Sequence, residues 1–212
     1  MQYILDNPDR VLELTAEHVR IVAISVLLAV LIGVPAGVLV TRVRWLEAPI
    51  INLTGVLYTV PSLALFAILI PYTGLGASTA IFALVLYSLL AIVRNTIAGI
   101  DGVLPATLDA ARGMGMTGRQ RLLLVELPLA LPVILAGVRV ATVSNIGIAT
   151  IAAAIGAGGL GRLIFDGIRT IDPDRIVAGA LPASLLALAA DIGLTWLGTA
   201  LRRDVGRTSG NG

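Results

Sequence analysis

DAARGMGMTGRQRLLLVELP, residues 109–128, is a polar interruption in an otherwise apolar chain. The pattern predicts a short helix, a glycine hinge and a second short helix. The first helix is expected to begin near Pro105, because proline fits the first turn of a helix. It is expected to stop at Gly113 and Gly115, since glycine readily adopts the left-handed conformation that ends helices.

The second short helix is expected to start at Thr117. The Thr117 hydroxyl can accept a hydrogen bond from the amide three residues on, while the Gln120 side chain reaches back, which forms a capping box. Pro128 is expected to end this helix, because proline cannot donate a backbone hydrogen bond and crowds the residue before it.

The composition sets the class of protein. The 212 residues are 57% hydrophobic, with a mean hydropathy of +0.96, whereas soluble domains are about 45–50% apolar. Several apolar runs approach the ~20 residues that a helix needs to cross a bilayer. We therefore expect residues 1–212 to form one all-α membrane domain. The chain has no cysteine and one histidine, so no metal site is expected.

Five membrane spans are predicted, with an interfacial helix before them at residues 1–20 and a long polar loop at residues 94–128. The spans cover about residues 21–40, 48–70, 77–93, 129–155 and 176–201. In the first span, Gly33 and Gly37 have a spacing that permits close contact between helices. The tail from Arg202 onward is rich in Gly and Ser and is expected to be disordered.

The distribution of arginine predicts the orientation. Five spans place the two termini on opposite sides of the membrane. With the N-terminus outside, nine arginines lie inside and five outside; the nine are Arg42, Arg44, Arg94, Arg112, Arg119, Arg121, Arg202, Arg203 and Arg207. Arginine is enriched in cytoplasmic segments, so we expect the C-terminus and residues 94–128 in the cytoplasm. The basic residues sit at membrane boundaries, and no nucleic-acid partner is expected.

The spacing within residues 109–128 resembles the EAA loop in membrane subunits of bacterial ABC importers. That loop has Glu-Ala-Ala, three residues, Gly, nine residues, Ile, one residue and Leu-Pro. Here Asp109-Ala110-Ala111 matches the triplet, Gly115 the glycine, and Val125 with Leu127-Pro128 the end. Asp in place of Glu keeps the negative charge, and Val in place of Ile keeps the branched apolar shape.

In that family the loop lies in the cytoplasm and docks into a groove on the ATP-hydrolysing subunit. The resemblance therefore implies that residues 94–128 form a coupling loop. The residues expected to contact the ATPase subunit are Asp109, Ala110, Ala111, Arg112, Gly115, Gly118, Leu127 and Pro128.

Residues 127–161 extend the resemblance to the permease subunits of osmoprotectant importers, through LPLALPVILAGVR (127–139) and ATVSNIGIATIAAAIGAGGLG (141–161). This implies a type I importer fold in the bacterial inner membrane and a substrate such as glycine betaine, carnitine or choline. It also implies a second permease copy, an ATP-binding subunit dimer that holds ATP-Mg, and an external substrate-binding protein. Permeases for methionine or an alkylsulfonate are the alternatives within the importer class.

Two nucleotide motifs are excluded. The chain has no GxxxxGK[ST] and no lysine, so it is not expected to hydrolyse ATP or to bind a cofactor itself. GAGGLG at residues 156–161 formally matches the dinucleotide fingerprint GxGxxG. That fingerprint needs a short strand before it, and here a membrane-length apolar run precedes it.

Polar residues inside the predicted spans are candidates for the substrate pathway. Pro61 is expected to kink the second span, with Tyr58 and Ser62 beside it, and Ser144 and Asn145 lie at mid-depth in the fourth. Pairing between helices is the alternative role for each polar side chain.

Arg139 and Asp191 each lie about ten residues from the same end of their spans, roughly 15 Å deep at ~1.5 Å per residue. A charge inside a membrane must be paired or hydrated, so we expect an ion pair; alternatively, Arg139 faces the pathway. His18 is expected on the surface of the N-terminal helix.

Other transporter and enzyme classes fit the sequence poorly. Ion-driven secondary transporters usually show inverted repeats or intramembrane acids, and this chain shows no repeat and one such acid, Asp191. An intramembrane hydrolase would need a motif such as His-Glu-x-x-His or Gly-x-Ser-x-Gly, and neither occurs.

Overall fold

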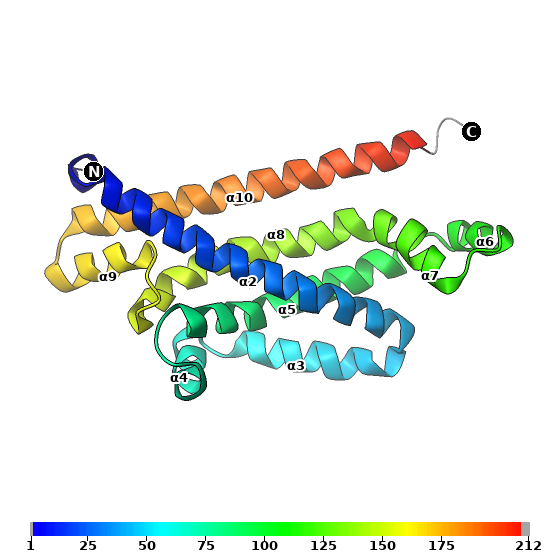
Figure 1. The fold of residues 1–212 in the computed structure, drawn as a ribbon, viewed down its shortest axis with the longest axis horizontal. Helices are drawn as coiled ribbons and strands as arrows, with labels where there is room; N and C mark the ends of the chain where they lie inside the picture. The colour runs from blue at the N-terminus through cyan, green and yellow to red at the C-terminus, as the bar shows by residue number, and fades with distance from the viewer. Residues whose placement is uncertain (1, 209–212) are drawn as a thin grey trace.

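The computed structural model describes residues 2–208, with side chains for residues 2–201, and all regular elements in this range are helical (Figure 1). Four long helices run along the long axis of the molecule: α2 (Pro8–Arg42), α5 (Ala77–Asp101), α8 (Leu127–Ala152) and α10 (Pro173–Thr208). The shorter ones are α1 (Gln2–Asp6), α3 (Glu47–Thr59), α4 (Ser62–Thr73), α6 (Pro105–Gly113), α7 (Gly118–Arg121) and α9 (Gly161–Thr170). Single turns are η1 (Arg44–Leu46), η2 (Leu122–Glu126) and η3 (Ala153–Ile155).

Helix α5 is the centre of the bundle. It packs against α2 and α8, and α3 and α4 also lie on it. Small residues make these contacts close: a Cβ added to Gly37 of α2 would lie 2.6 Å from Thr96 Cβ of α5. A Cβ added to Gly137 of α8 would lie 2.6 Å from Asn95 Cβ. The contact predicted from the spacing of Gly33 and Gly37 is therefore present.

Four of the described helices are long and apolar enough to cross a membrane, and the α3–α4 pair makes a fifth if its two parts count as one span. That pair is bent by 104°. The proline kink expected in the second span is thus a break, with Val60 and Pro61 extended between two separate helices.

The N-terminal prediction was wrong. Residues 8–42 form one continuous helix, α2, instead of an interfacial helix followed by a span. Val11, Leu14 and His18 extend the buried stripe of Ile21 towards the N-terminus, and nothing between them breaks the helix. Val11 and Leu14 pack with Leu160, Leu163, Ala178 and Ala183, so tertiary burial keeps this segment in line with the rest of α2.

Two other boundaries also differ from the predictions. Helix α5 continues to Asp101, eight residues past the expected end at 93, because Thr96, Ile97 and Ile100 keep its buried face going. Helix α10 continues to Thr208, so the segment from Arg202 to Thr208 is helical rather than disordered. Residues 209–212 of the predicted tail lie outside the described residues.

Replacing Gly37 by Val should disrupt the contact between α2 and α5, because the new side chain would overlap Thr96. Overpacking of this kind costs about 1–3 kcal/mol, and we expect a lower midpoint in thermal unfolding of the purified protein in detergent. Gly55→Val in α3 is the matched control, since a Cβ there meets nothing within 4 Å. Equal midpoints for the two variants would contradict this account.

Candidate functional site

The α6–α7 segment, residues 105–121, forms one end of the molecule (Figure 1). Helix α6 begins at Pro105, as predicted. It closes with two hydrogen bonds, from the Met116 amide to the Ala111 carbonyl (3.1 Å) and from the Gly115 amide to the Arg112 carbonyl (2.9 Å). Gly115 has a φ of 76°, so this is a Schellman motif in which glycine supplies the left-handed residue.

The capping box predicted for α7 is also present. The Thr117 amide donates to Gln120 Oε1 at 2.8 Å, and the Gln120 amide donates to Thr117 Oγ1 at 3.3 Å. A helix stop at Gly115 and a helix start at Thr117 therefore fix the turn between α6 and α7.

The prediction that Pro128 ends the second helix was wrong. Residues 122–126 form a π turn that leads directly into α8, and the Leu127 amide donates to the Leu122 carbonyl, five residues back. A π turn holds one extra residue, which brings Pro128 into the first turn of α8. There the missing N–H of proline costs little. The α6–α7 segment is thus joined to α8 without a break in the helix.

The residues that match the importer motif differ in exposure. Asp109 and Arg112 form an exposed ion pair on α6, with Arg112 Nη1 2.7 Å from Asp109 Oδ1. Ala110 is exposed too, but Ala111 is 1% exposed. Asp109, Ala110 and Arg112 are thus accessible to another protein, whereas Ala111 packs inside this chain.

The remaining matched residues lie at the turn and at the start of α8. Gly115, Gly118 and Pro128 are exposed, and Leu127 is partly buried. Leu127 packs against the buried cluster of Ile100, Ala130 and Ile134, whereas Gly115, Gly118 and Pro128 are open to a partner.

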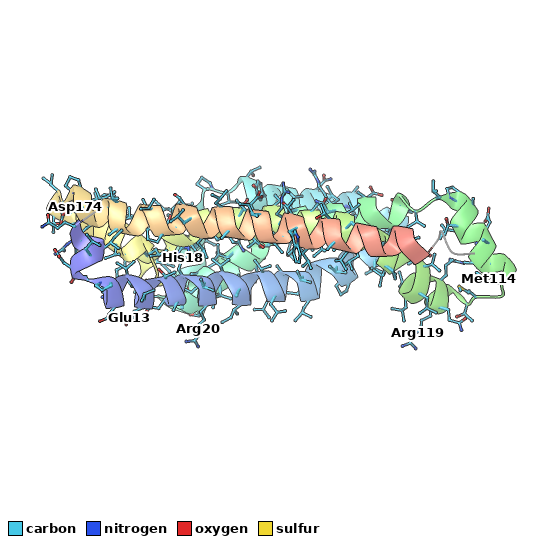
Figure 2. All side chains as sticks on the ribbon, turned by 90° about the horizontal axis from the view of Figure 1, so that it is seen from above. Glu13, His18, Arg20, Met114, Arg119 and Asp174 are labelled. Atoms are coloured by element: carbon cyan, nitrogen blue, oxygen red, sulfur yellow. The ribbon has the colours of Figure 1, made fainter. Side chains whose placement is uncertain are left out.

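Large apolar side chains surround this end, and sequence reasoning missed them. The residues concerned are Leu104, Met114, Leu123 and Leu124, which are 70%, 70%, 49% and 65% exposed. Figure 2 shows Met114 at the far end of the molecule from Asp174. Grouped exposed apolar side chains mark contact surfaces, so this end combines polar and apolar groups that a partner can cover.

A buried carboxylate beneath the α6–α7 segment was also missed. Glu126, in the π turn, is 2% exposed and pairs with two arginines. Arg42, the last residue of α2, donates to Glu126 Oε2, and Arg121, the last residue of α7, donates to Oε1 at 3.1 Å. Residues 42 and 126 are 84 positions apart, and no local pattern predicts that they pair.

A second ion pair lies at the same end of the bundle. Arg44 binds Asp101 through two hydrogen bonds of 2.8 and 2.6 Å. This bidentate pair joins the turn after α2 to the last residue of α5. Together with Glu126, Asp101 lines a polar pocket of about 430 Å³ between the ends of α2 and α5 and helix α6.

The break at Pro61 is stabilised by a tyrosine from α5. Tyr87 donates its hydroxyl to the Val60 carbonyl at 2.5 Å, which satisfies an acceptor that the broken helix leaves free. Tyr58 is 45% exposed and meets the Tyr87 ring edge-on, with centroids 6.1 Å apart. Pro61 is exposed and Ser62, the first residue of α4, is partly buried.

The pathway candidates in α8 lie in different surroundings. Ser144 is partly exposed, whereas Asn145 is fully buried and donates from Nδ2 to Ser88 Oγ of α5 at 2.8 Å. Asn145 thus joins two helices, which is the alternative role considered for it. A lining role for Tyr58, Pro61, Ser62 and Ser144 stays a prediction.

The ion pair expected between α8 and α10 is present. Arg139 Nε lies 3.1 Å from Asp191 Oδ1, and Arg139 Nη1 donates to Thr195 Oγ1 at 2.6 Å. The two charged side chains are 39% and 42% exposed. Each thus neutralises the other while part of the pair stays open to the surface of the chain.

At the opposite end, a glycine-rich loop docks on α2. The Gly159 amide donates to Glu17 Oε2 at 2.9 Å, and Gly156, Gly158 and Gly159 all have positive φ. Helix α8 and η3 precede this loop, so GAGGLG follows a helix and not a strand.

His18 is not a surface residue, contrary to the prediction. It is fully buried, with Nε2 3.1 Å from the Ile146 carbonyl of α8 and its ring against Gly159. The reason is the continuity of α2, which places residue 18 inside the helix bundle rather than on an isolated interfacial helix.

Residues 29–206 match the family model described as "Binding-protein-dependent transport system inner membrane component". The chain belongs to this family. Among curated relatives, the osmoprotectant import permease protein OsmW of Salmonella typhimurium is 48% identical, covering 90% of this chain and 91% of that protein. The choline transport system permease protein OpuBB of Bacillus subtilis is 45% identical, with 90% and 88% covered.

Solved structures show the same fold. The permease resembles a chain of the MetNI methionine ABC transporter in an inward-facing conformation, with 22% identity and a TM-score of 0.82, over 91% of this chain and 96% of that chain. It also resembles a chain of an amino acid ABC transporter with histidines, with 19% identity, a TM-score of 0.70, and 95% and 96% covered. Its fold is that of a type I ABC importer permease.

Replacing Tyr87 by Phe in this permease should lower the stability of the protein around the break at Pro61, because the Val60 carbonyl loses its hydrogen-bond donor. The hydrogen bond is part-buried and a typical hydrogen bond contributes about 0.5–1.5 kcal/mol, so we expect a lower unfolding midpoint in detergent. Tyr72→Phe removes the same hydroxyl from a side chain that is 83% exposed, and its midpoint should equal that of the parent protein. A Tyr87→Phe midpoint equal to that of Tyr72→Phe would refute the assignment.

Proposed function

We propose that this chain is the membrane-spanning subunit of an ATP-driven importer for a quaternary ammonium osmoprotectant such as glycine betaine, carnitine or choline. The observation that carries the proposal is that close relatives are named as osmoprotectant, choline and carnitine permeases. The exposed α6–α7 segment supports it, because its residue spacing resembles that of an ATPase-docking loop. The likeness to the methionine transporter is 22% in identity and concerns the fold alone.

The energy for transport would come from another subunit. The chain has no phosphate-binding loop and no lysine, so ATP and Mg²⁺ would be bound by an ATP-binding subunit dimer. We place the α6–α7 segment in the cytoplasm and the N-terminus outside, in a bacterial inner membrane, because the arginine excess favours that orientation. A second permease copy and an extracytoplasmic substrate-binding protein would complete the importer.

The α6–α7 segment can transmit movement because its shape is fixed. The Schellman motif at Gly115 and the capping box at Thr117 hold the two short helices, and the π turn joins them to α8. Closure of the ATPase dimer against Asp109, Ala110 and Arg112 would therefore tilt α8 between inward-open and outward-open states.

Selectivity would lie mainly in the external binding protein. A quaternary ammonium group is usually held by a cage of aromatic rings, and this chain has three Phe, two Trp and four Tyr in 212 residues. Pairing with Asp191 offsets the charge of Arg139, so a cationic substrate would meet no net positive charge at that depth. The permease would then provide a path that binds substrate weakly.

Uptake by reconstituted vesicles tests the proposal directly. Vesicles that hold this permease with its ATPase subunits should take up radiolabelled glycine betaine or choline only when ATP is inside and the binding protein is outside. Uptake driven by an ion gradient without ATP would instead indicate a secondary transporter. Methionine uptake in place of both osmolytes would overturn the substrate assignment.

Replacing Gly115 by Val should lower coupled uptake, because a β-branched residue is strained at a φ of 76°. Strain of about 1–2 kcal/mol corresponds to a loss of uptake on the order of tenfold. Membrane insertion and ATP hydrolysis should persist. Gly113→Val is the matched control two residues away, since a Cβ there meets nothing within 4 Å and its φ is negative. Unchanged uptake in Gly115→Val would count against the role of this fixed turn in coupling.

A further inference from the structure

Glu126 connects three helical elements through one carboxylate. It lies in the π turn between α7 and α8, and its side chain is 2% exposed. Arg42 ends α2 and binds Glu126 Oε2, while Arg121 ends α7 and binds Oε1. Residues 42 and 126 are 84 positions apart in sequence, so this contact depends entirely on the tertiary fold.

Burial makes this carboxylate dependent on its partners. Removing a charge from water is costly, and breaking a buried pair leaves the remaining charge uncompensated. Both oxygens of Glu126 are engaged, each by a different arginine. Any displacement of α7 relative to the end of α2 would therefore separate a buried carboxylate from one of its cations.

Few other contacts link the α6–α7 segment to α2. Helix α6 packs mainly against α7, and a polar pocket of about 430 Å³ lies between α6 and the ends of α2 and α5. The neighbouring pair of Arg44 with Asp101 joins the α2 end to α5 and not to α7. Among the residues with described side chains, Glu126 is thus the ionic link between the α6–α7 segment and α2, beside the direct packing of α2 on α8.

We propose that Glu126 is a positioning residue that makes the C-terminal end of α2 move together with the α6–α7 segment during the transport cycle. The proposal rests on the proposed function, since it assumes that an ATPase subunit drives the segment. On this basis α2 and α8 receive the movement together, α8 through the continuous helix and α2 through the carboxylate.

The first test measures how many ATP molecules are hydrolysed per solute carried, in vesicles that hold the complete importer. Glu126→Gln keeps the shape of the side chain and removes the charge. We expect uptake to fall by about tenfold while ATP hydrolysis and assembly with the ATPase persist, so that ATP consumed per solute rises in proportion. Arg42→Gln should have the same effect.

The double variant Glu126→Gln/Arg42→Gln decides whether the two residues act as one unit. If they do, its uptake should fall no further than that of either single variant, because the link is already lost. Additive losses would overturn the proposal. Arg10→Gln is the matched control, since Arg10 pairs with Glu13 three residues along the same helix and joins no two elements; its ratio of ATP to solute should equal that of the native importer.

A distance measurement separates positioning from a purely structural role. The chain has no cysteine, so spin labels can be placed only at introduced cysteines, Trp45→Cys beside the α2 end and Arg119→Cys on α7. Both parent residues are exposed, and Figure 2 shows the Arg119 side chain pointing away from the body. The label distance should stay constant with and without ATP in the native background and should change on adding ATP in Glu126→Gln.

The outcomes distinguish the two levels of the proposal. If native vesicles show no ATP-driven uptake, the proposed function fails. If native uptake depends on ATP but Glu126→Gln matches the native ratio of ATP to solute and the native label distances, only the positioning role is refuted.

Discussion

The structure depends on satisfying the backbone wherever a helix in an apolar protein is interrupted. Inside a bilayer, an unpaired N–H or C=O group costs several kcal/mol, so interruptions need built-in partners. At the Pro61 break the partner is the Tyr87 hydroxyl, and at the glycine-rich loop it is the Glu17 carboxylate. In the π turn the backbone satisfies itself with a longer bond, from Leu127 to Leu122. These three solutions let one bundle of helices contain a broken span, a docked loop and an unbroken helical connection from the α6–α7 segment to α8.

Close packing around α5 supplies the other part of the architecture. Glycines at positions 37 and 137 bring α2 and α8 against α5 at distances that a Cβ would not allow. Within this packing, Asn145 of α8 and Ser88 of α5 hydrogen-bond to each other between the helices. The partly exposed Arg139–Asp191 pair is different, because it leaves charged groups on a face of α8 and α10 that lipid would not tolerate bare. That face therefore needs water or protein against it.

Local chemistry made part of this structure predictable. The limits of the α6–α7 turn followed from Pro105, Gly115, Thr117 and Gln120, because each acts within a few residues of itself. The Arg139–Asp191 pair followed from equal depth in two spans. Tertiary contacts were not predictable: Glu126 finds Arg42 across 84 residues, and His18 is buried only because α2 continues past the expected boundary. The π turn was missed because the pattern around Pro128 fits a helix stop and a wide turn equally well.

Helix α2 contacts the segments that flank α8 in sequence. Arg42 binds Glu126 just before α8, and Glu17 accepts a hydrogen bond from the Gly159 amide in the loop after α8. Sliding of one helix along the other would stretch a charge-assisted hydrogen bond at each end. Shear between the two helices would therefore have to break one or both of these bonds. The extended two-residue link at Val60 and Pro61, between helices set at 104°, is held instead by one neutral hydrogen bond, from the Tyr87 hydroxyl to the Val60 carbonyl, and so is the more weakly tied joint.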